Sequence, residues 1–200
     1  MRMKIISCTG KNDPTDWFAI KRQKPPPVLC IVGFSGSGKT TVSVGLVEAL
    51  RRRGLRVGTI KHDVHGFEMD QPGKDSWRHK QAGAATTIVS SPNQIGMVMD
   101  VDHDHQPLEL LALMQGMDIV LVEGFKRADL PKIEVFRQET GKPAACRGDR
   151  HLIAVVSEAQ LNWGVPMYLP DDTEGLCIFI LERLLPEFYE DGICRQAVCS

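Results

Sequence analysis

A glycine-rich segment from Gly33 to Thr40 constrains the fold of this chain more than any other feature. It reads Gly-Phe-Ser-Gly-Ser-Gly-Lys-Thr and matches the G-x-x-x-x-G-K-[ST] pattern of a phosphate-binding loop without a mismatch. The apolar run Val28–Val32 precedes it and suits a buried strand. A helical pattern follows and ends in three arginines and Gly54, which are typical of a helix carboxyl end with a left-handed glycine cap. The sequence therefore predicts strand, loop and helix in the order that the motif needs.

The predicted loop supplies the groups that bind a nucleoside triphosphate. Its glycines let successive backbone N–H groups point at one phosphate, and the start of the helix adds partial positive charge. Lys39 is expected to reach the β and γ phosphates, and Thr40 is expected to place its hydroxyl on Mg²⁺. The loop residues predicted to bind the nucleotide are Gly33, Ser35, Gly36, Ser37, Gly38, Lys39 and Thr40.

Length and composition fit one cytoplasmic α/β domain. The 200 residues are 24% charged and 42% hydrophobic, as in an ordinary globular protein. A net charge of −1 argues against bulk attraction to nucleic acid or to a membrane. No apolar run approaches the roughly 20 residues of a membrane span, and no signal peptide opens the chain. The cysteines form no C-x-x-C pair, which indicates reduced thiols.

Strands and helical patterns alternate along the chain, which predicts a mainly parallel sheet with helices on both faces. Ligands of such sheets bind at the carboxyl ends of the strands. Besides the first strand, strands are expected at Arg56–Ile60, Asp118–Val122, Lys132–Phe136 and Leu152–Val156, and helical segments at Trp77–Ala84, Leu108–Leu113 and Gly175–Leu185.

Two short β-prone runs, Thr86–Val89 and Ile95–Met99, predict a β-hairpin near residues 86–99. Such a hairpin is irregular for a doubly wound sheet and could pair with another subunit. The expected organisation is an N-terminal extension and linker over residues 1–27, a P-loop domain over 28–186 and a C-terminal tail over 187–200.

The predicted strand at Asp118–Val122 offers two acids, and the one at its carboxyl end is expected to serve the magnesium. Parallel strands all end on the side of the phosphate-binding loop. Asp118 lies five residues before Glu123, about 16 Å away at roughly 3.3 Å per residue, so it is expected to be a solvated strand start. Glu123 is expected to hold Mg²⁺ through water or to orient an attacking water.

The polar segment after the second strand contains further candidates. Asp70 is a second candidate for the metal, Lys74 could contact phosphate, and His62 is expected to serve phosphate or substrate. The pair His103-x-His105 lies in an acidic loop, but a transition-metal site needs three or four converging ligands. The six histidines therefore do not predict such a site.

Three segments together resemble the molybdopterin-guanine dinucleotide biosynthesis adaptor protein B family. They are Gly33–Thr41, Lys61-His62 through Asp70-Gln-Pro-Gly-Lys-Asp75-Ser76, and Val122-Glu-Gly-Phe-Lys126 with Pro131-Lys-Ile-Glu134. The resemblance runs from about residue 27 to 185. It implies a GTP-binding protein with weak Mg²⁺-dependent GTPase activity, usually a homodimer. Such a protein assists the molybdenum cofactor guanylyltransferase that attaches GMP to molybdopterin.

The resemblance also implies roles for individual residues. Gly36, Gly38, Lys39, Thr40 and Thr41 would bind phosphate and Mg²⁺, and Asp70, Lys74, Asp75, Glu123 and Lys126 would line the nucleotide or partner-facing cleft. The N-terminal extension and the cysteine-bearing tail have no counterpart in the family pattern. No N-K-x-D guanine motif is present. Glu158, at a comparable late strand end, could accept hydrogen bonds from guanine instead.

Two other readings remain open from the sequence, which by itself does not separate guanine from adenine. One is a stand-alone small-molecule kinase or ATP-dependent ligase of the P-loop class. Kinases normally carry an arginine-rich lid, and between Asp100 and Gln138 the only arginines are Arg127 and Arg137. The other is a metal-insertion GTPase, which would need a converging set of Cys and His residues.

Overall fold

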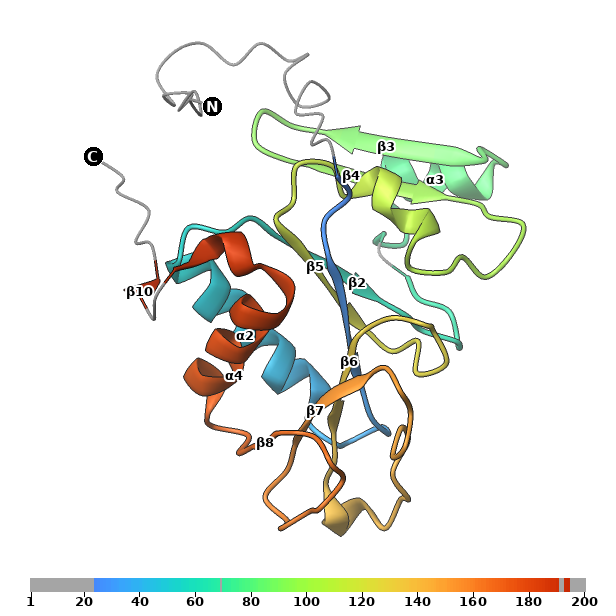
Figure 1. Cartoon of the computed structure of the whole chain (residues 1–200). Helices are drawn as coiled ribbons and strands as arrows, with labels where there is room; N and C mark the ends of the chain where they lie inside the picture. Colours follow the sequence, from blue (N-terminus) through green and yellow to red (C-terminus); the bar gives the residue numbers. More distant parts are fainter. Residues whose placement is uncertain (1–23, 69, 191–192, 195–200) are drawn as a thin grey trace. The chain divides into compact units, whose positions relative to one another are not determined.

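The structure is a computed structural model that describes residues 24–68, 70–190 and 193–194 (Figure 1). The described chain divides into two compact units, one formed by residues 62–106 and the other by the residues before and after them. Most of the predicted N-terminal extension and much of the predicted tail lie outside the described residues. In the part that is described, no helix is long and apolar enough to cross a membrane.

The larger unit is built on a parallel sheet with the strand order β2-β5-β1-β6-β7-β8. All five strands predicted for this sheet are present with ends shifted by at most one residue, which confirms the α/β fold. The sixth strand, β8, is short and was not predicted. The bounds are β1 Val28–Val32, β2 Val57–Lys61, β5 Ile119–Glu123, β6 Lys132–Val135, β7 Leu152–Val156 and β8 Met167–Tyr168.

One face of this sheet is covered by two α-helices, α2 (Lys39–Arg52) and α4 (Thr173–Leu184) (Figure 1). Alternate residues of β1 point to opposite faces, so Leu29 and Ile31 join the helical side chains in the core. Helix α2 ends as predicted, because Gly54 has a φ of 78° and its N–H donates to the carbonyl of Arg51 at 2.9 Å.

The other face of the sheet packs against η1 (Glu109–Leu113) and against loop side chains. The helical pattern predicted at Leu108–Leu113 is thus a short 3₁₀ helix. Cys30 and Val32 of β1 lie on this face, and both are fully buried. Two apolar layers therefore enclose β1, which explains why this strand is apolar at every position.

Asp118 is buried, so the expectation of a solvated strand start is wrong. Its side chain is 5% exposed, and its Oδ2 accepts a hydrogen bond from the backbone N–H of Arg56 at 2.6 Å. The backbone N–H of Asp118 donates in turn to the carbonyl of Arg56 at 2.7 Å. Asp118 thus supplies an acceptor for the backbone N–H of Arg56 where β2 and β5 begin to pair.

The smaller unit contains helix α3 (Asp75–Gln81) and an antiparallel hairpin of β3 (Thr86–Ser90) and β4 (Ile95–Met99). The predicted hairpin is confirmed, and α3 packs against β3. In the observed register Ile88 pairs with Met97, which puts four exposed apolar side chains on one face of the hairpin. These are Ile88, Ile95, Met97 and Met99.

Three more short segments lie at the carboxyl end of the larger unit. The 3₁₀ helix η3 (Pro186–Phe188) leads into β9 (Tyr189–Glu190), which pairs antiparallel with β10 (Ile193–Cys194). A further 3₁₀ helix, η2 (Gln138–Thr140), follows β6.

Candidate functional site

The loop between β1 and α2 takes a conformation that requires glycine at two points. Gly33 has a φ of 144°, and a Cβ atom there would lie 2.4 Å from the carbonyl oxygen of Val135. Gly38 immediately precedes α2 with a φ of 98°. Side chains are strained at such angles. The two glycines therefore let the backbone turn tightly from the end of β1 into the first turn of the helix.

Lys39 folds back over this loop. Its Nζ donates a hydrogen bond to the carbonyl oxygen of Phe34 at 2.9 Å. Burial lowers the pKa of Lys39 from its ordinary 10.5; the nearby Glu123 carboxylate opposes that shift, and Lys61 reinforces it. The ammonium group is thus held at the mouth of the loop by a single carbonyl, a contact that a phosphate oxygen can replace.

Thr40 and Glu123 meet although they are 83 positions apart in the sequence. The hydroxyl of Thr40 donates to Oε2 of Glu123 at 3.0 Å. Helix α2 places Thr40 in its first turn. The parallel pairing of β1 with β5 sets Glu123 opposite Ile31, two residues before the loop. The structure therefore brings together two of the three residues predicted to bind magnesium; the third, Asp70, belongs to the unit of residues 62–106.

These two side chains fit the ligand preferences of Mg²⁺. The ion prefers oxygen donors and usually takes only one or two protein carboxylates, because it keeps several of its waters. A hydroxyl and a carboxylate within hydrogen-bond distance meet that requirement. The described part of the chain contains no group of three or more His, Cys, Asp or Glu side chains that could hold a metal.

The segment after Glu123 crosses onto the phosphate-binding loop. Gly124 donates its N–H to the carbonyl of Ile31 at 3.1 Å, and Phe125 has a φ of 51°, which is uncommon for a residue with a side chain. The chain then places Nζ of Lys126 4.9 Å from the centroid of the Phe34 ring. Lys126 is therefore a second cation beside the loop.

Two charged side chains of β6 are buried and bonded inside the protein. Lys132 and Glu134 are each 1% exposed. Nζ of Lys132 donates to Oδ2 of Asp149 at 2.7 Å and to the carbonyl of Lys126 at 3.0 Å. The Glu134 carboxylate accepts from the backbone N–H groups of Ala145 and Cys146 at 2.6 and 2.7 Å.

These buried contacts fix the loops around the site. The bond from Lys132 to the carbonyl of Lys126 holds the end of the Glu123–Lys126 segment. Reading the sequence alone, we did not assign this role. One pattern in the sequence does indicate it. Lys132 and Glu134 alternate with apolar residues inside a predicted strand, so both charged side chains lie on the same face of that strand.

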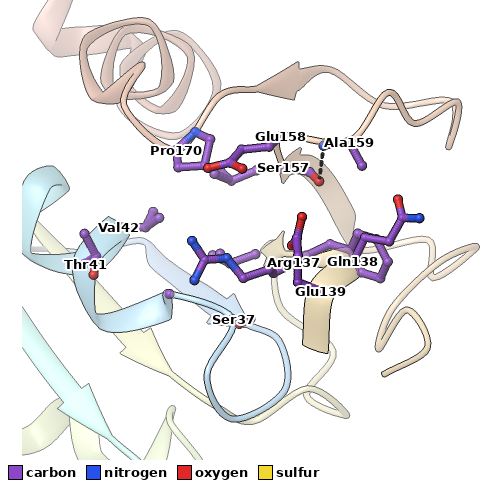
Figure 2. Close-up of a pocket in the computed structure, with 14 residues that line it drawn as sticks. Ser37, Thr41, Val42, Arg137, Gln138, Glu139, Ser157, Glu158, Ala159 and Pro170 are labelled. Atoms are coloured by element: carbon purple, nitrogen blue, oxygen red, sulfur yellow. Dashed lines mark hydrogen bonds between the residues drawn. The ribbon is translucent and has the colours of Figure 1, made fainter. Parts of the chain in front are cut away.

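A pocket opens beside the loop on the side of β6 and β7. It holds about 550 Å³ of space, counting its open mouth. Glu158, the predicted guanine acceptor, lies in its lining, as do Ser37 and Thr41 of the predicted phosphate site (Figure 2). The complete lining is Ser37, Gly38, Thr41, Val42, Val135–Glu139, Val156–Ala159 and Pro170.

Arg137 is a pocket residue that we did not identify from the sequence. It is the second residue after the end of β6 and is exposed. In Figure 2 its guanidinium group points toward the start of α2, and the Glu158 carboxylate projects from the opposite wall. Ser157 is buried beside Glu158, and its Oγ accepts from the backbone N–H of Ala159 at 3.1 Å.

The other predicted loop residues differ in exposure. Ser35, Gly36, Thr40 and Thr41 are exposed at the surface of the loop. Ser37 is 6% exposed, and its hydroxyl has no hydrogen-bond partner among the residues that the structure describes. Four of the predicted loop residues therefore face solvent, and the Ser37 hydroxyl lies buried with no hydrogen bond to the described residues.

The remaining predicted site residues belong to the unit of residues 62–106, where they make local contacts. Nε2 of His62 lies 3.0 Å from Oδ1 of Asp104. Oδ1 of Asp70 accepts from the hydroxyl of Ser76 at 2.9 Å. Lys74 immediately precedes α3, and Asp75 begins it with an exposed side chain. Their roles toward phosphate or Mg²⁺ stay predictions.

Comparison with known proteins gives consistent matches. The sequence profile of the family described as molybdopterin guanine dinucleotide synthesis protein B matches residues 28–158. The molybdopterin-guanine dinucleotide biosynthesis adapter protein of Escherichia coli strain K12 is 41% identical over 161 residues, which cover 78% of this chain and 92% of that protein. The corresponding protein of Haemophilus influenzae is 39% identical over 141 residues, which cover 68% and 77% of the two chains.

A solved structure agrees with the observed fold. The crystal structure of Bacillus subtilis MobB superposes with a TM-score of 0.65 at 29% identity, and the match covers 79% of this chain and 98% of that chain. The region matched by the family profile includes the phosphate-binding loop, Glu123 and Glu158.

Proposed function

This chain belongs to the molybdopterin guanine dinucleotide synthesis protein B family, and on that premise we propose that it binds GTP with Mg²⁺ in the biosynthesis of molybdopterin guanine dinucleotide. The nucleotide would lie on the loop from Gly33 to Thr41. The protein would act as an adaptor to the molybdenum cofactor guanylyltransferase and assist the attachment of GMP to molybdopterin. The matched relatives are themselves named adapter proteins.

The contact between Thr40 and Glu123 is the observation that carries this proposal. It sets a hydroxyl and a carboxylate 3.0 Å apart at the start of α2, next to the cation of Lys39. Thr40 and Glu123 would hold Mg²⁺, which when bound neutralises charge on the β and γ phosphates. Lys39 would exchange its bond to the Phe34 carbonyl for bonds to phosphate oxygens.

We propose that hydrolysis is slow because Glu123 serves two tasks. Its carboxylate already accepts a hydrogen bond from Thr40, so the same group would hold the metal shell and orient water. A carboxylate engaged on the metal side is poorly placed to accept a proton from an attacking water. Slow turnover suits a protein that keeps GTP bound while a partner enzyme acts.

We also propose that the protein is a homodimer that pairs through the hairpin. The exposed apolar side chains of Ile88, Ile95, Met97 and Met99 form one face of β3 and β4, and a face of this kind is stabilised by burial against another chain. Ile95→Asp is expected to shift the molecular mass measured by analytical ultracentrifugation toward that of the monomer. Leu113→Asp, a matched change at an exposed aliphatic residue outside the hairpin, is expected to leave it unchanged. A dimeric Ile95→Asp protein would contradict this pairing.

A titration of the protein with GTP and ATP, with and without Mg²⁺, tests the proposed function. Calorimetry is expected to give tighter binding of GTP than of ATP and a further gain with Mg²⁺. Addition of the protein to a guanylyltransferase assay with molybdopterin is then expected to raise the yield of the dinucleotide. A preference for ATP would instead support a stand-alone kinase or ATP-dependent ligase. GTP binding without stimulation would remove the adaptor role.

A further inference from the structure

The order of strands determines where a nucleotide base can lie. Strand β1 leads into the phosphate-binding loop and has β5 on one side and β6 on the other. The Thr40–Glu123 contact lies on the β5 side, and the pocket lies at the ends of β6 and β7. A nucleotide whose terminal phosphate lies near Glu123 therefore extends its nucleoside toward β6 and β7. This step rests on the proposed binding of a triphosphate.

The pocket walls carry charges of opposite sign. Arg137 extends from the end of β6, and Glu158 follows the end of β7 (Figure 2). Both residues are exposed, so their charged groups are accessible to a ligand. Val42 and Pro170 add apolar surface to the same pocket. The pocket thus offers a fork of N–H donors, a carboxylate with two acceptor oxygens and apolar contact surface.

This combination matches the two polar edges of guanine. Guanine presents O6 and N7 as neighbouring acceptors, to which an arginine donates two parallel hydrogen bonds. Its N1–H and N2–H groups are neighbouring donors, to which one carboxylate can accept twice. Adenine has an acceptor at N1 next to its amino group, so the second carboxylate oxygen would face a lone pair. The charges of this pocket therefore favour guanine over adenine.

We propose that this pocket is the base subsite, that Arg137 determines guanine specificity by donating to O6 and N7, and that Glu158 accepts from N1 and N2. Arg137 takes the place of a sequence motif that is missing here, since the chain has no N-K-x-D segment. Glu139 is the other acid of the pocket lining.

The test measures the affinities of GTP, ATP, xanthosine triphosphate and inorganic triphosphate by calorimetry with Mg²⁺. Arg137→Gln is expected to weaken GTP about tenfold or more, as the loss of a bidentate contact does, and to leave ATP and inorganic triphosphate unchanged. Arg147→Gln is the matched control, because Arg147 is exposed and lies outside the pocket lining. It should bind all four compounds as the parent does.

A gain of binding provides the second measurement. Xanthine carries a carbonyl where guanine carries the N2 amino group, so an amide N–H is a better partner than a carboxylate. Glu158→Gln is expected to lose affinity for GTP and to gain affinity for xanthosine triphosphate, a change that misfolding cannot produce. Glu48→Gln, the same chemical change at an exposed acid of α2 outside the pocket lining, is the control and is expected to produce neither effect. Glu139→Gln tests the other acid of the pocket lining.

The outcomes separate the two proposals. If the parent binds none of the four compounds, the proposed function fails and the base subsite fails with it. If the parent binds inorganic triphosphate and GTP but Arg137→Gln and Glu158→Gln leave the GTP-to-ATP ratio unchanged, the triphosphate site remains and the base subsite is overturned. A xanthosine gain in Glu139→Gln instead of Glu158→Gln would overturn the assignment of Glu158.

Discussion

Two groups of charged side chains lie near the same phosphate-binding loop, and they differ in burial. On β6, Lys132 and Glu134 are 1% exposed, and their hydrogen bonds go to other parts of the protein. Around the start of α2, Lys39 and Glu123 are only partly buried and make one short contact each to Phe34 and Thr40. The first group holds loops in place, whereas the second can exchange its contacts for a ligand.

The comparison separates charged side chains that stabilise the fold from charged side chains that can bind a ligand. Both groups fall in segments that resemble the same family, and both use lysine and glutamate. A buried charge needs partners in the folded protein, and because Lys132 is only 1% exposed, a ligand from solvent does not reach it. A half-buried charge with a single replaceable partner has that capacity. Substitutions in the two groups should therefore alter different measurable quantities.

The largest effect is expected for Lys39→Ala in the half-buried group. The change removes at least two charge-assisted hydrogen bonds to phosphate, which together contribute on the order of 4 kcal/mol. The affinity for GTP measured by calorimetry should then fall about a thousandfold. The free energy of unfolding should change by less than about 1 kcal/mol, because a single carbonyl contact is lost.

Lys24→Ala is the control for this change, since Lys24 is exposed and precedes β1. It should keep both the affinity and the stability of the parent. If Lys39→Ala bound GTP as tightly as the parent, the proposal that this loop binds the nucleotide would be wrong.

The next largest effect is expected for Lys132→Met in the buried group, and it should appear in stability. The change removes the ammonium group that donates to Oδ2 of Asp149 and to the carbonyl of Lys126. Breaking a buried pair from one side costs about 3 kcal/mol or more. Urea unfolding followed by circular dichroism measures this loss. The exposed Lys142→Met is the matched control and should change stability by less than about 0.5 kcal/mol.

A small stability loss in Lys132→Met, comparable to that of the control, would contradict the structural role given to β6. A protein that remains stable but binds GTP weakly would transfer Lys132 to the ligand-binding group. Either result would contradict the division of these charged residues into a buried structural group and a half-buried ligand-binding group.

A smaller effect, on rate, is expected for Glu123→Gln. The amide keeps an oxygen that can accept from Thr40, so GTP binding should persist within a few-fold. The loss of charge should slow hydrolysis by up to about a hundredfold, the low end of the contribution of one positioned acid or base. Phosphate release at saturating GTP measures the rate. Glu48→Gln, an exposed change on α2, should hydrolyse GTP at the parent rate, and a parent-like rate in Glu123→Gln would exclude Glu123 from the reaction.

Most of the sheet could be predicted from the sequence, because its strands are short apolar runs and the loop motif fixes the order of the first strand and helix. Glu123 could be selected over Asp118 because parallel strands end on one side. The burial of Asp118 could not be predicted, since it depends on the pairing of β2 with β5 over a long stretch of chain.

Arg137 and Lys132 could not be assigned for a similar reason. Their surroundings come from segments distant in sequence, the start of α2 and the turn that contains Asp149. No local pattern distinguishes an arginine that enters a pocket from one that faces water. For Lys132, alternation within the strand indicated burial of the charge but not its partner.

The smallest expected effect is a change in how the free energy of unfolding depends on pH. The hydrogen bond from Lys132 chiefly lowers the pKa of Asp149 below its ordinary 3.8. A carboxyl whose pKa is lower in the folded than in the unfolded state stabilises the fold above the unfolded pKa, and that stabilisation is lost as the pH falls through the folded value. The parent should therefore lose stability below about pH 4, partly through Asp149.

Lys132→Met removes the donor that lowers this pKa, so Asp149 in the variant is protonated at higher pH and contributes little to the acid loss. The difference in unfolding free energy between parent and variant should accordingly be largest near neutral pH and should shrink below about pH 4. Urea unfolding of both proteins at several pH values from neutral to acid measures it. A difference that stays constant with pH would mean that Lys132 stabilises the fold by packing its stem and not through its charge.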